Sequence, residues 1–219
     1  MSRDFDGTDD VIKPPTTQLY SGLGTLTIFA FVNYDVFGKQ IAGIWGDGGE
    51  GSSSWFLGDN GTGKVRMAVK PSGASVRTAD STTSPSAGRW YVLAGTFDKS
   101  NTTSGCKVWL NFVNESSSNI DSADLSNPNV DLGIGGQNTG GSQGFLNGKI
   151  SYVQIFNRVL SANEMKQISF YPGSIRRGLI GFWPLWGSSS PEPDYTFNNN
   201  SGVVTGALKG NIDPPVNGI

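Results

Sequence analysis

Apolar and polar residues alternate along several short segments of the chain. Between Thr25 and Val32, the apolar residues Leu26, Ile28 and Ala30 occupy every second position, which is the period of a β-strand with one face turned to a core. Clusters of Gly, Ser, Asn and Asp separate such segments and favour turns. The pattern therefore predicts a series of short antiparallel strands. The further predicted strands cover residues 40–45, 55–57, 64–69, 90–97, 106–113 and 146–156.

One helix is predicted near residue 161. Ser161 and Glu164 have the spacing of a capping box, in which the serine hydroxyl accepts a hydrogen bond from a helical amide and the glutamate reaches back to the cap. Met165 and Ile168 would then face inward together. The sequence Tyr-Pro-Gly-Ser at 171–174 ends the helix.

Strand-like sequence returns after this helix. Residues 178–185 are apolar enough for a buried strand that ends at a proline. Phe182 and Trp183 point to opposite faces of such a strand, so one of them should enter the core. Residues 203–207 predict one more short strand, and the prolines near the end predict an extended tail over residues 209–219.

Length and composition agree with an all-β fold. A chain of 219 residues with 31 glycines and 16% charged residues fits one sandwich with many tight turns. We expect a single domain over residues 1–219, an antiparallel β-sandwich of the jelly-roll type with one short helix, in which residues 178–208 complete the sandwich. Cys106, the one cysteine, lies in strand-like sequence and is expected to be a small buried side chain.

Charge and residue content argue against several partners. The net charge is −2 and the longest basic run is Arg176–Arg177, so we expect no nucleic acid binding. Histidine is absent, which removes the usual general base and zinc ligand. No run of about 18 apolar residues occurs and the N-terminus lacks the pattern of a secretion signal. We therefore expect no membrane partner, and synthesis in the cytoplasm.

Four blocks of sequence, in matching order and spacing, resemble laminin G-like jelly-roll domains of the concanavalin A-like lectin/glucanase superfamily. The resemblance implies a concanavalin A-like β-sandwich, and four blocks in register are more specific than any one of them. The blocks are residues 4–12, 88–98, 107–111 and 145–164, and the resemblance covers about residues 3–168.

Residues 178–185, together with residues 200–207, resemble the strand pair that normally precedes the first of these blocks. Here the pair comes last, so the sequence resembles a circularly permuted module whose C-terminal segment closes its own sandwich. The arrangement is also similar to uncharacterised structural proteins of bacteriophages and of marine viral sequence. That similarity is one of fold and implies a function only by analogy.

The segment Gly58–Lys64 comes close to a phosphate-binding loop, which has glycine, four residues and then Gly-Lys. The next residue is Val65, so no hydroxyl follows to reach magnesium. Residues 64–69 also alternate as a strand, where such a loop requires a helix N-terminus. We therefore predict a hairpin turn and no nucleotide.

The densest carboxylates of the chain lie between residues 4 and 10. Carboxylates suit calcium, but the glycine and the final glutamate of an EF-hand are absent. The resemblance implies an acidic residue directly after Gly-Lys-Ile in relatives that bind calcium, and here those positions are Ser151 and Tyr152. We expect no essential cofactor, with structural calcium held by Asp6, Asp9 and Asp10 as the open alternative.

Glycosidases on this sandwich resemble one another in two glutamates and an aspartate on one strand, because retaining hydrolysis needs two carboxyl groups about 5 Å apart. The four glutamates of the chain are Glu50, Glu115, Glu164 and Glu192, and none belongs to such a strand. Glu164 is in addition assigned to the helix cap. We therefore expect no enzymatic activity and no catalytic residue.

Aromatic residues near predicted turns are candidates for stacking on sugar rings or for anchoring a protein interface. Packing over a sandwich edge is the alternative for each ring. Trp90 and Trp109 lie inside predicted strands and are expected in the core. The loop of residues 46–54 is the best candidate for the rim of a binding site, although its composition also fits a plain flexible loop. The candidate ligand-binding residues are Trp45, Asp47, Glu50, Trp55, Tyr171, Trp186 and Tyr195.

The expected function is binding or assembly without catalysis. A chain with neither a secretion signal nor a disulfide can reach the cell exterior inside a virus particle that is released by lysis. The leading hypothesis is therefore a bacteriophage virion surface subunit, either a capsid decoration or a tail-associated protein. Its partners would be other virion proteins such as the major capsid protein, with cell-surface glycans and a homo-oligomer left open. The alternative function is a soluble carbohydrate-binding lectin.

Overall fold

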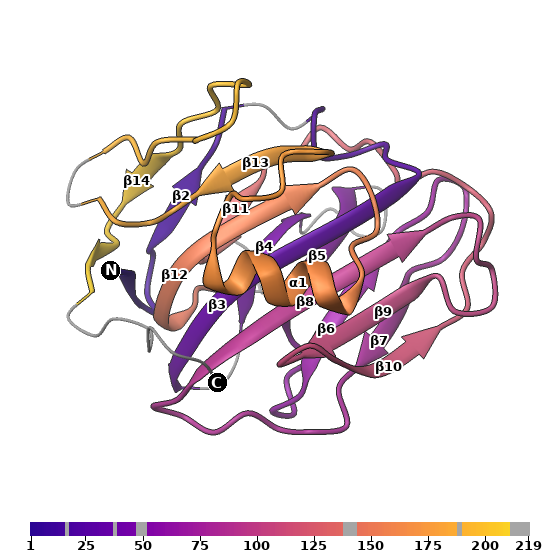
Figure 1. Cartoon of the computed structure of the whole chain (residues 1–219), viewed down its shortest axis with the longest axis horizontal. Helices are drawn as coiled ribbons and strands as arrows, with labels where there is room; N and C mark the ends of the chain where they lie inside the picture. The colour runs from indigo at the N-terminus through magenta and orange to yellow at the C-terminus, as the bar shows by residue number, and fades with distance from the viewer. Residues whose placement is uncertain (16–17, 37–38, 47–51, 138–143, 188–189, 211–219) are drawn as a thin grey trace.

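Two antiparallel sheets face each other across a hydrophobic core, and one helix covers the outer face of the larger sheet (Figure 1). The computed structural model describes residues 1–15, 18–36, 39–46, 52–137, 144–187 and 190–210. In Figure 1 the helix lies in front of the larger sheet, and the smaller sheet lies behind it. The predicted class, an all-β antiparallel sandwich with one short helix, is confirmed.

Strand order differs from chain order in both sheets. Among the described residues, the larger sheet has eight strands in the order β10 (Val113–Ser118), β9 (Cys106–Leu110), β8 (Trp90–Asp98), β3 (Thr25–Val36), β12 (Asn147–Phe156), β1 (Arg3–Asp6) and β15 (Leu208–Lys209), with β13 (Leu179–Trp183) also paired to β12. The smaller sheet has, within the same residues, seven strands in the order β14 (Val203–Thr205), β2 (Val11–Lys13), β11 (Gly133–Ile134), β4 (Gln40–Trp45), β5 (Ser53–Asp59), β6 (Val65–Val69) and β7 (Arg77–Asp80).

One predicted strand is in fact a hairpin. The run expected as a single strand over residues 106–113 contains a tight turn at Asn111 and Phe112, which both have positive φ, at 46° and 70°. The chain therefore reverses, and β9 pairs antiparallel with β10. Apolar alternation alone did not reveal this turn, because Phe112 continues the apolar pattern through it.

The long strand β3 is buried on both faces. Leu26 and Ile28 pack between the two sheets, as predicted. Phe29 and Phe31 point to the opposite face and join a second apolar cluster under the helix. The alternating pattern identified the inner face, and the outer face is apolar as well because the helix covers it.

The helix α1 (Ala162–Phe170) begins with the predicted capping box. The hydroxyl of Ser161 accepts a hydrogen bond from the amide of Glu164, whose carboxylate accepts one from the amide of Ser161 at 2.9 Å. A hydrogen bond from Arg158 at 2.7 Å lowers the pKa of the Glu164 carboxyl to about 2. Met165 and Ile168 are buried against the sheet, as predicted. No helix in the described part of the chain has the length and apolar character needed to cross a membrane.

One edge of β12 is covered by strands from both ends of the chain (Figure 1). The opposite edge of β12 pairs with β3 over nearly its whole length. On the edge that faces away from β3, β1 pairs with residues 147–150 and β13 pairs with residues 153–156. Between these two strands, the hydroxyl of Ser151 donates a hydrogen bond to the carbonyl of Met1 at 3.0 Å. Segments far apart in the sequence therefore lie side by side on this edge.

Residues 178–208 contribute strands to both sheets. β13 and β15 extend the larger sheet, and β14 pairs with β2 at the edge of the smaller one. A buried ion pair fastens this segment to β1, with Arg3 Nη2 and Glu192 Oε2 2.8 Å apart. Lys209, which the sequence placed in an extended tail, lies in β15, and residues 211–219 of that tail fall outside the described residues.

The two aromatic residues of β13 are buried on opposite faces. Trp183 lies in the main core, where Nε1 donates a hydrogen bond to the carbonyl of Asn200 at 3.0 Å and the ring meets Tyr20 edge to face at 5.7 Å. Phe182 joins the cluster under α1. The sequence predicted one of the two in the core, and both are buried because both faces of the larger sheet are covered.

The cysteine and two further tryptophans were assigned to the core from sequence. Cys106 is buried between the sheets, and burial raises the pKa of its thiol to about 12. Trp90 is buried in the cluster under α1. Trp109 is only partly buried, and its Nε1 donates a hydrogen bond to the hydroxyl of Thr96 at 3.3 Å.

The substitution Trp183→Ala tests how firmly the C-terminal segment belongs to the core. We expect it to lower the free energy of unfolding by about 3–5 kcal/mol, because it leaves a large cavity in the main core. Urea denaturation measures the effect. Phe197→Ala is the matched control, since Phe197 lies on the same segment and is fully exposed, and should change stability by less than about 0.5 kcal/mol. Equal losses for the two variants, or an unchanged midpoint for a chain truncated after Pro172, would contradict the prediction.

Candidate functional site

A groove crosses the outer face of the smaller sheet. It has a volume of about 320 Å³ and runs over β4, β5, β6 and β7. Its lining includes the apolar residues Trp45, Phe56 and Ala68 and the polar residues Arg66 and Thr78. Because side chains of a strand alternate between faces, these residues point away from the core that their neighbours in sequence form.

The strand register explains why the surface is hollow here. Gly43 pairs with Phe56, Phe56 with Ala68, and Ala68 with Thr78. This row places one large ring between two small residues. A side chain at Gly43 would bring a Cβ to within 2.5 Å of the Phe56 Cβ, so glycine is the residue that fits this position.

Two aromatic rings form the apolar part of the groove. The ring centroids of Trp45 and Phe56 lie 5.0 Å apart with an interplanar angle of 73°, an edge-to-face arrangement that aromatic pairs favour. Phe56 is buried, whereas Trp45 is partly exposed. Trp45 therefore exposes apolar ring surface in the groove, and Phe56 packs against that ring.

A charged pair borders the rings on the next strands. Arg66 donates from Nε and Nη2 to the two carboxylate oxygens of Asp80, at 2.6 and 2.7 Å. Asn60 adds a third hydrogen bond to Asp80 at 3.0 Å. The hydrogen bond from Arg66 lowers the pKa of Asp80, and the same bond raises the pKa of Arg66. Both groups are therefore charged near neutral pH, and they lie opposite each other in the register of β6 and β7.

The predicted hairpin turn closes one end of the groove. Asp59 and Asn60 accept hydrogen bonds from the amides of Gly61 and Thr62, respectively, and the chain re-enters the sheet at Val65. The prediction of a turn in place of a phosphate-binding loop is confirmed. Burial raises the pKa of Asp59, and its Oδ2 has no hydrogen-bond partner among the described residues.

The residues that the sequence proposed for ligand binding divide into separate places. Trp45 lines the groove. The proposal for Trp55 is wrong, because this ring is 0% exposed in the main core and its Nε1 donates a hydrogen bond to the carbonyl of Tyr20 at 2.7 Å. Trp55 precedes Phe56 by one residue and therefore points to the inner face of β5. Asp47 and Glu50 lie outside the described residues.

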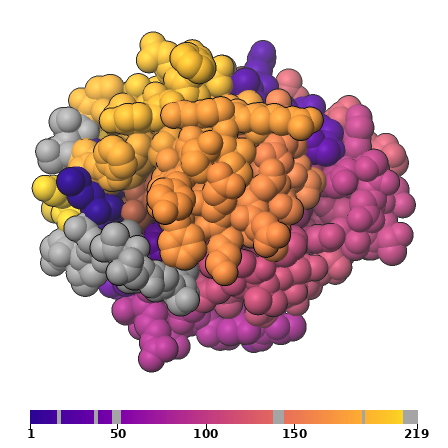
Figure 2. Space-filling model, viewed as in Figure 1, coloured from indigo at the N-terminus to yellow at the C-terminus, as the bar shows by residue number. Residues whose placement is uncertain are grey.

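The other three proposed residues lie on the helix side of the sandwich. Trp186 and Tyr195 meet edge to face at 5.7 Å, and Tyr195 also contacts Phe182 of the cluster under α1 at 6.0 Å. Tyr171 caps the C-terminus of α1 and is 70% exposed. Figure 2 shows this side of the molecule, where the C-terminal part in orange and yellow forms much of the surface. These rings are therefore not brought together with Trp45.

Phe56 and Arg66 of the groove, and Asp80 beside it, could not be identified from sequence. All three lie inside strands, where an outward-facing residue has no distinctive local pattern. One signal was present: Arg66 interrupts the apolar residues Val65 and Met67, so it had to point outward from a buried strand. The outward-facing residues of the neighbouring strands β5 and β7 therefore lie on the same face of the sheet as Arg66.

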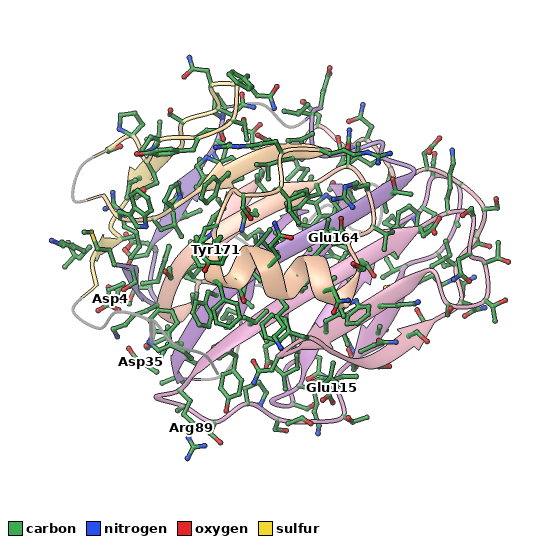
Figure 3. The ribbon with its side chains drawn as sticks, viewed as in Figure 1. Asp4, Asp35, Arg89, Glu115, Glu164 and Tyr171 are labelled. Atoms are coloured by element: carbon green, nitrogen blue, oxygen red, sulfur yellow. The ribbon has the colours of Figure 1, made fainter. Side chains whose placement is uncertain are left out.

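Aspartates gather in a second pocket, which is lined by residues from β1, β3, β12 and β15 of the larger sheet. Carboxylate oxygens of Asp6, Asp9 and Asp10 lie within 4.8 Å of one another, so the structure does bring together the residues proposed for calcium. The pocket has a volume of about 490 Å³ and also includes Asp4 and Asp35. Lys149 lies between these last two, with its Nζ 3.4 Å from Asp4 and 2.8 Å from Asp35. Figure 3 shows Asp4 and Asp35 as neighbours, far from Glu115.

The chemistry of these aspartates suits a hard cation only in part. Asp10 is buried and accepts a hydrogen bond from the amide of Asp6 at 2.8 Å. Burial, together with the charges of Asp6, Asp9 and Asp4, raises the pKa of Asp10. A cation would relieve that repulsion. Ser151 and Tyr152, where the resemblance implied an acidic residue in relatives that bind calcium, have other partners here: the hydroxyl of Ser151 donates to the carbonyl of Met1, and the hydroxyl of Tyr152 donates to the carbonyl of Ser169 at 3.0 Å.

Sequence comparison places the chain in a family of lectin-like sandwiches. The family described as the concanavalin A-like lectin/glucanases superfamily matches residues 6–166. The chain therefore belongs to this superfamily, as its laminin G-like sequence blocks indicated. No curated protein matches the chain.

Solved structures show the same fold. A Bacteroides ovatus protein for which carbohydrate binding has been suggested matches with a TM-score of 0.76 at 21% identity, over 99% of this chain and 61% of its own length. The heptameric SAP-like pentraxin of Limulus polyphemus matches with a TM-score of 0.62 at 13% identity, over 95% of this chain and 94% of its own. Domains LG4-5 of the mouse laminin alpha1 chain match with a TM-score of 0.51 at 17% identity, over 70% and 40%. Identities this low establish the fold alone.

The raised pKa of Asp10 predicts a pH-dependent stability. A carboxyl whose pKa is higher in the folded than in the unfolded chain favours folding below the unfolded pKa and loses that contribution as pH rises through the folded pKa. An asparagine does not ionise, so Asp10→Asn avoids this loss of stability at high pH. Its amide oxygen can still accept the hydrogen bond from the amide of Asp6. We therefore expect a higher thermal midpoint than wild type at pH 7 and no difference at pH 3. Asp131→Asn, at an exposed position outside the pocket, should show neither effect; a midpoint that falls at pH 7 in Asp10→Asn would contradict the argument.

Chelation tests whether a metal supports the fold. We expect a chelator to leave the thermal midpoint unchanged, because Ser151 and Tyr152 stand where the resemblance implied an acidic ligand, and both hydroxyls bond to backbone carbonyls. A ligand at hundredfold saturation would contribute about 2.7 kcal/mol, which calorimetry detects easily. A midpoint that falls in chelator and returns with calcium in wild type, but not in Asp10→Asn, would show that the pocket holds calcium.

Proposed function

We propose that the protein binds carbohydrate in the groove of the smaller sheet. The observation that carries the proposal is the partly exposed ring of Trp45, supported edge to face by Phe56 and placed beside polar side chains. Sugars present an apolar face of C–H groups and a rim of hydroxyls. An aromatic wall next to fixed hydrogen-bonding groups matches both parts.

The polar side of the groove supports the same proposal. Arg66, Asp80 and Asn60 hold one another in a fixed arrangement through three hydrogen bonds. Groups that are positioned before binding lose little conformational freedom when a ligand arrives. Thr78 adds an exposed hydroxyl on the neighbouring strand. A hydroxyl-rich ligand therefore finds donors and acceptors already in place.

Membership of a lectin-like superfamily and the structural likeness to the Bacteroides ovatus protein agree with this proposal. This chain spans 61% of that protein's length, so whatever that protein does as a whole is not carried over. The hypothesis of a bacteriophage virion subunit gains no support from the fold, the groove or the similar structures. It stays an untested prediction, and carbohydrate binding takes its place as the leading function.

We further propose that binding proceeds without catalysis. The three described glutamates each have a structural partner: Glu164 caps α1, Glu192 pairs with Arg3, and Glu115 accepts hydrogen bonds from Thr82 and Thr83. Retaining hydrolysis requires two carboxyl groups about 5 Å apart across a glycosidic bond. These glutamates come from three different parts of the sandwich and do not line the groove.

The substitution Trp45→Ala tests the proposal. A glycan array identifies a ligand for the full chain, and titration calorimetry then measures its dissociation constant. We expect Trp45→Ala to weaken binding by about 30-fold, since a central aromatic contact contributes about 2 kcal/mol or more. Trp186→Ala is the matched control, a half-exposed tryptophan on the opposite side, and should leave affinity unchanged. Binding that survives Trp45→Ala, or no binding to any glycan, would refute the proposal.

A further inference from the structure

The positive charge in the groove is already neutralised. Arg66 directs two of its N–H groups at both oxygens of Asp80, at 2.6 and 2.7 Å. This fork-to-fork geometry is the one with which an arginine would otherwise bind a ligand's carboxylate. A sugar acid would have to displace Asp80, which the pairing of β6 with β7 holds directly opposite Arg66. Among the described residues, the groove therefore has no guanidinium that is free of a carboxylate partner.

A second carboxylate stands close to this pair. Asp59 lies at the end of β5, lines the groove and interacts electrostatically with both Arg66 and Asp80. Tyr34 of β3 also interacts electrostatically with Asp59; it is neutral near pH 7, and burial raises its pKa further above its ordinary value. The described charged groups around Asp59 are thus one guanidinium and one further carboxylate. An incoming carboxylate would meet the charged carboxylate of Asp80, the carboxyl group of Asp59 and one cation that is already paired.

Lys39, the other cation among the described residues that line the groove, is too exposed to reverse this balance. Lys39 lies at the rim and is accessible to solvent. An ion pair with an exposed lysine gains little, because water and salt screen it and the long side chain loses freedom. Lys39 therefore offers no strong counterion for a ligand that sits against Trp45.

An uncharged sugar fits these groups without any rearrangement. Each hydroxyl can donate one hydrogen bond and accept others. It can donate to the carboxylate of Asp80 and accept from Nη1 of Arg66, which no described residue uses. The apolar face of the ring then lies against Trp45. The existing pair of Arg66 and Asp80 serves as one donor and one acceptor side by side.

We infer that the groove selects an uncharged pyranose and discriminates against sugars that carry a carboxylate, such as sialic or uronic acids. The inference rests on the proposed carbohydrate-binding function and adds the class of ligand. Structural likeness alone would not lead to it, because a sialic acid-binding module of Ruminococcus gnavus has a similar fold, with a TM-score of 0.54 at 17% identity.

The experiment compares glycans that differ by one carboxylate. The full chain is titrated with neutral oligosaccharides from an array, lactose among them, and with their sialylated or uronic counterparts, α2,3-sialyllactose among them. We expect the neutral member of the preferred pair to bind at least about tenfold more tightly, the factor that corresponds to 1.4 kcal/mol. The readout is the ratio of the two dissociation constants, so it does not depend on absolute affinity.

Two variants test the cause of the preference. Asp80→Asn removes one carboxylate and releases Arg66, so the ratio should shift toward the acidic glycan by about tenfold or more. Asp121→Asn is the matched control, because Asp121 forms an ion pair of similar exposure, 3.0 Å from Arg77 of β7, and Arg77 does not line the groove, whereas Arg66 does. It should leave the ratio unchanged.

The outcomes separate this inference from the proposed function. A wild-type preference for the acidic glycan that Trp45→Ala abolishes would overturn the inference and leave carbohydrate binding in the groove intact. An unchanged ratio in Asp80→Asn, with a thermal midpoint equal to wild type, would also overturn it. Failure to bind any glycan, or binding that is independent of Trp45, would overturn the proposed function and the inference together.

Discussion

The edge of β12 that faces away from β3 is the constraint on which the rest of the structure depends. Backbone amides and carbonyls along this edge must find partners, and two short strands from opposite ends of the chain supply them. Because β1 and β13 each cover only part of the edge, the two ends must be held in register. The buried pair of Arg3 and Glu192 holds them, and removing one charge would leave the other buried without a counterion, at a cost of about 3–5 kcal/mol.

The path of the chain to this edge also covers the outer face of the larger sheet and leaves the outer face of the smaller sheet open around the groove. The chain leaves β12, forms α1 over the larger sheet and returns along the edge as β13. Outward residues of the larger sheet, such as Phe29 and Phe31, therefore serve packing. Outward residues of β5 and β6, such as Phe56 and Arg66, line a groove that is open to solvent. The alternation of side chains along these strands thus produces a core on one face and the lining of the groove on the other.

Local patterns predicted the class of fold, the helix with its cap and the turn after β5, since each depends on residues that are close together in the chain. They did not distinguish Trp45 from Trp55, because both lie near turns. Strand parity separates them: Trp55 shares the inner face of β5 with Leu57, whereas Trp45 points outward beside a bulge. The pair of Arg66 and Asp80 could not be predicted, because it depends on the register between two strands, which no local pattern determines.

The position of Cys106 makes the chain suitable for site-selective labelling. A buried thiol that stays protonated at neutral pH reacts slowly with maleimides. A cysteine introduced at Thr78, on the exposed rim of the groove, would then be the one fast-reacting thiol, and a fluorophore attached there would report occupancy without removal of the native cysteine. Cys106 itself would react only when the two sheets separate, so its labelling rate would measure the opening of the core.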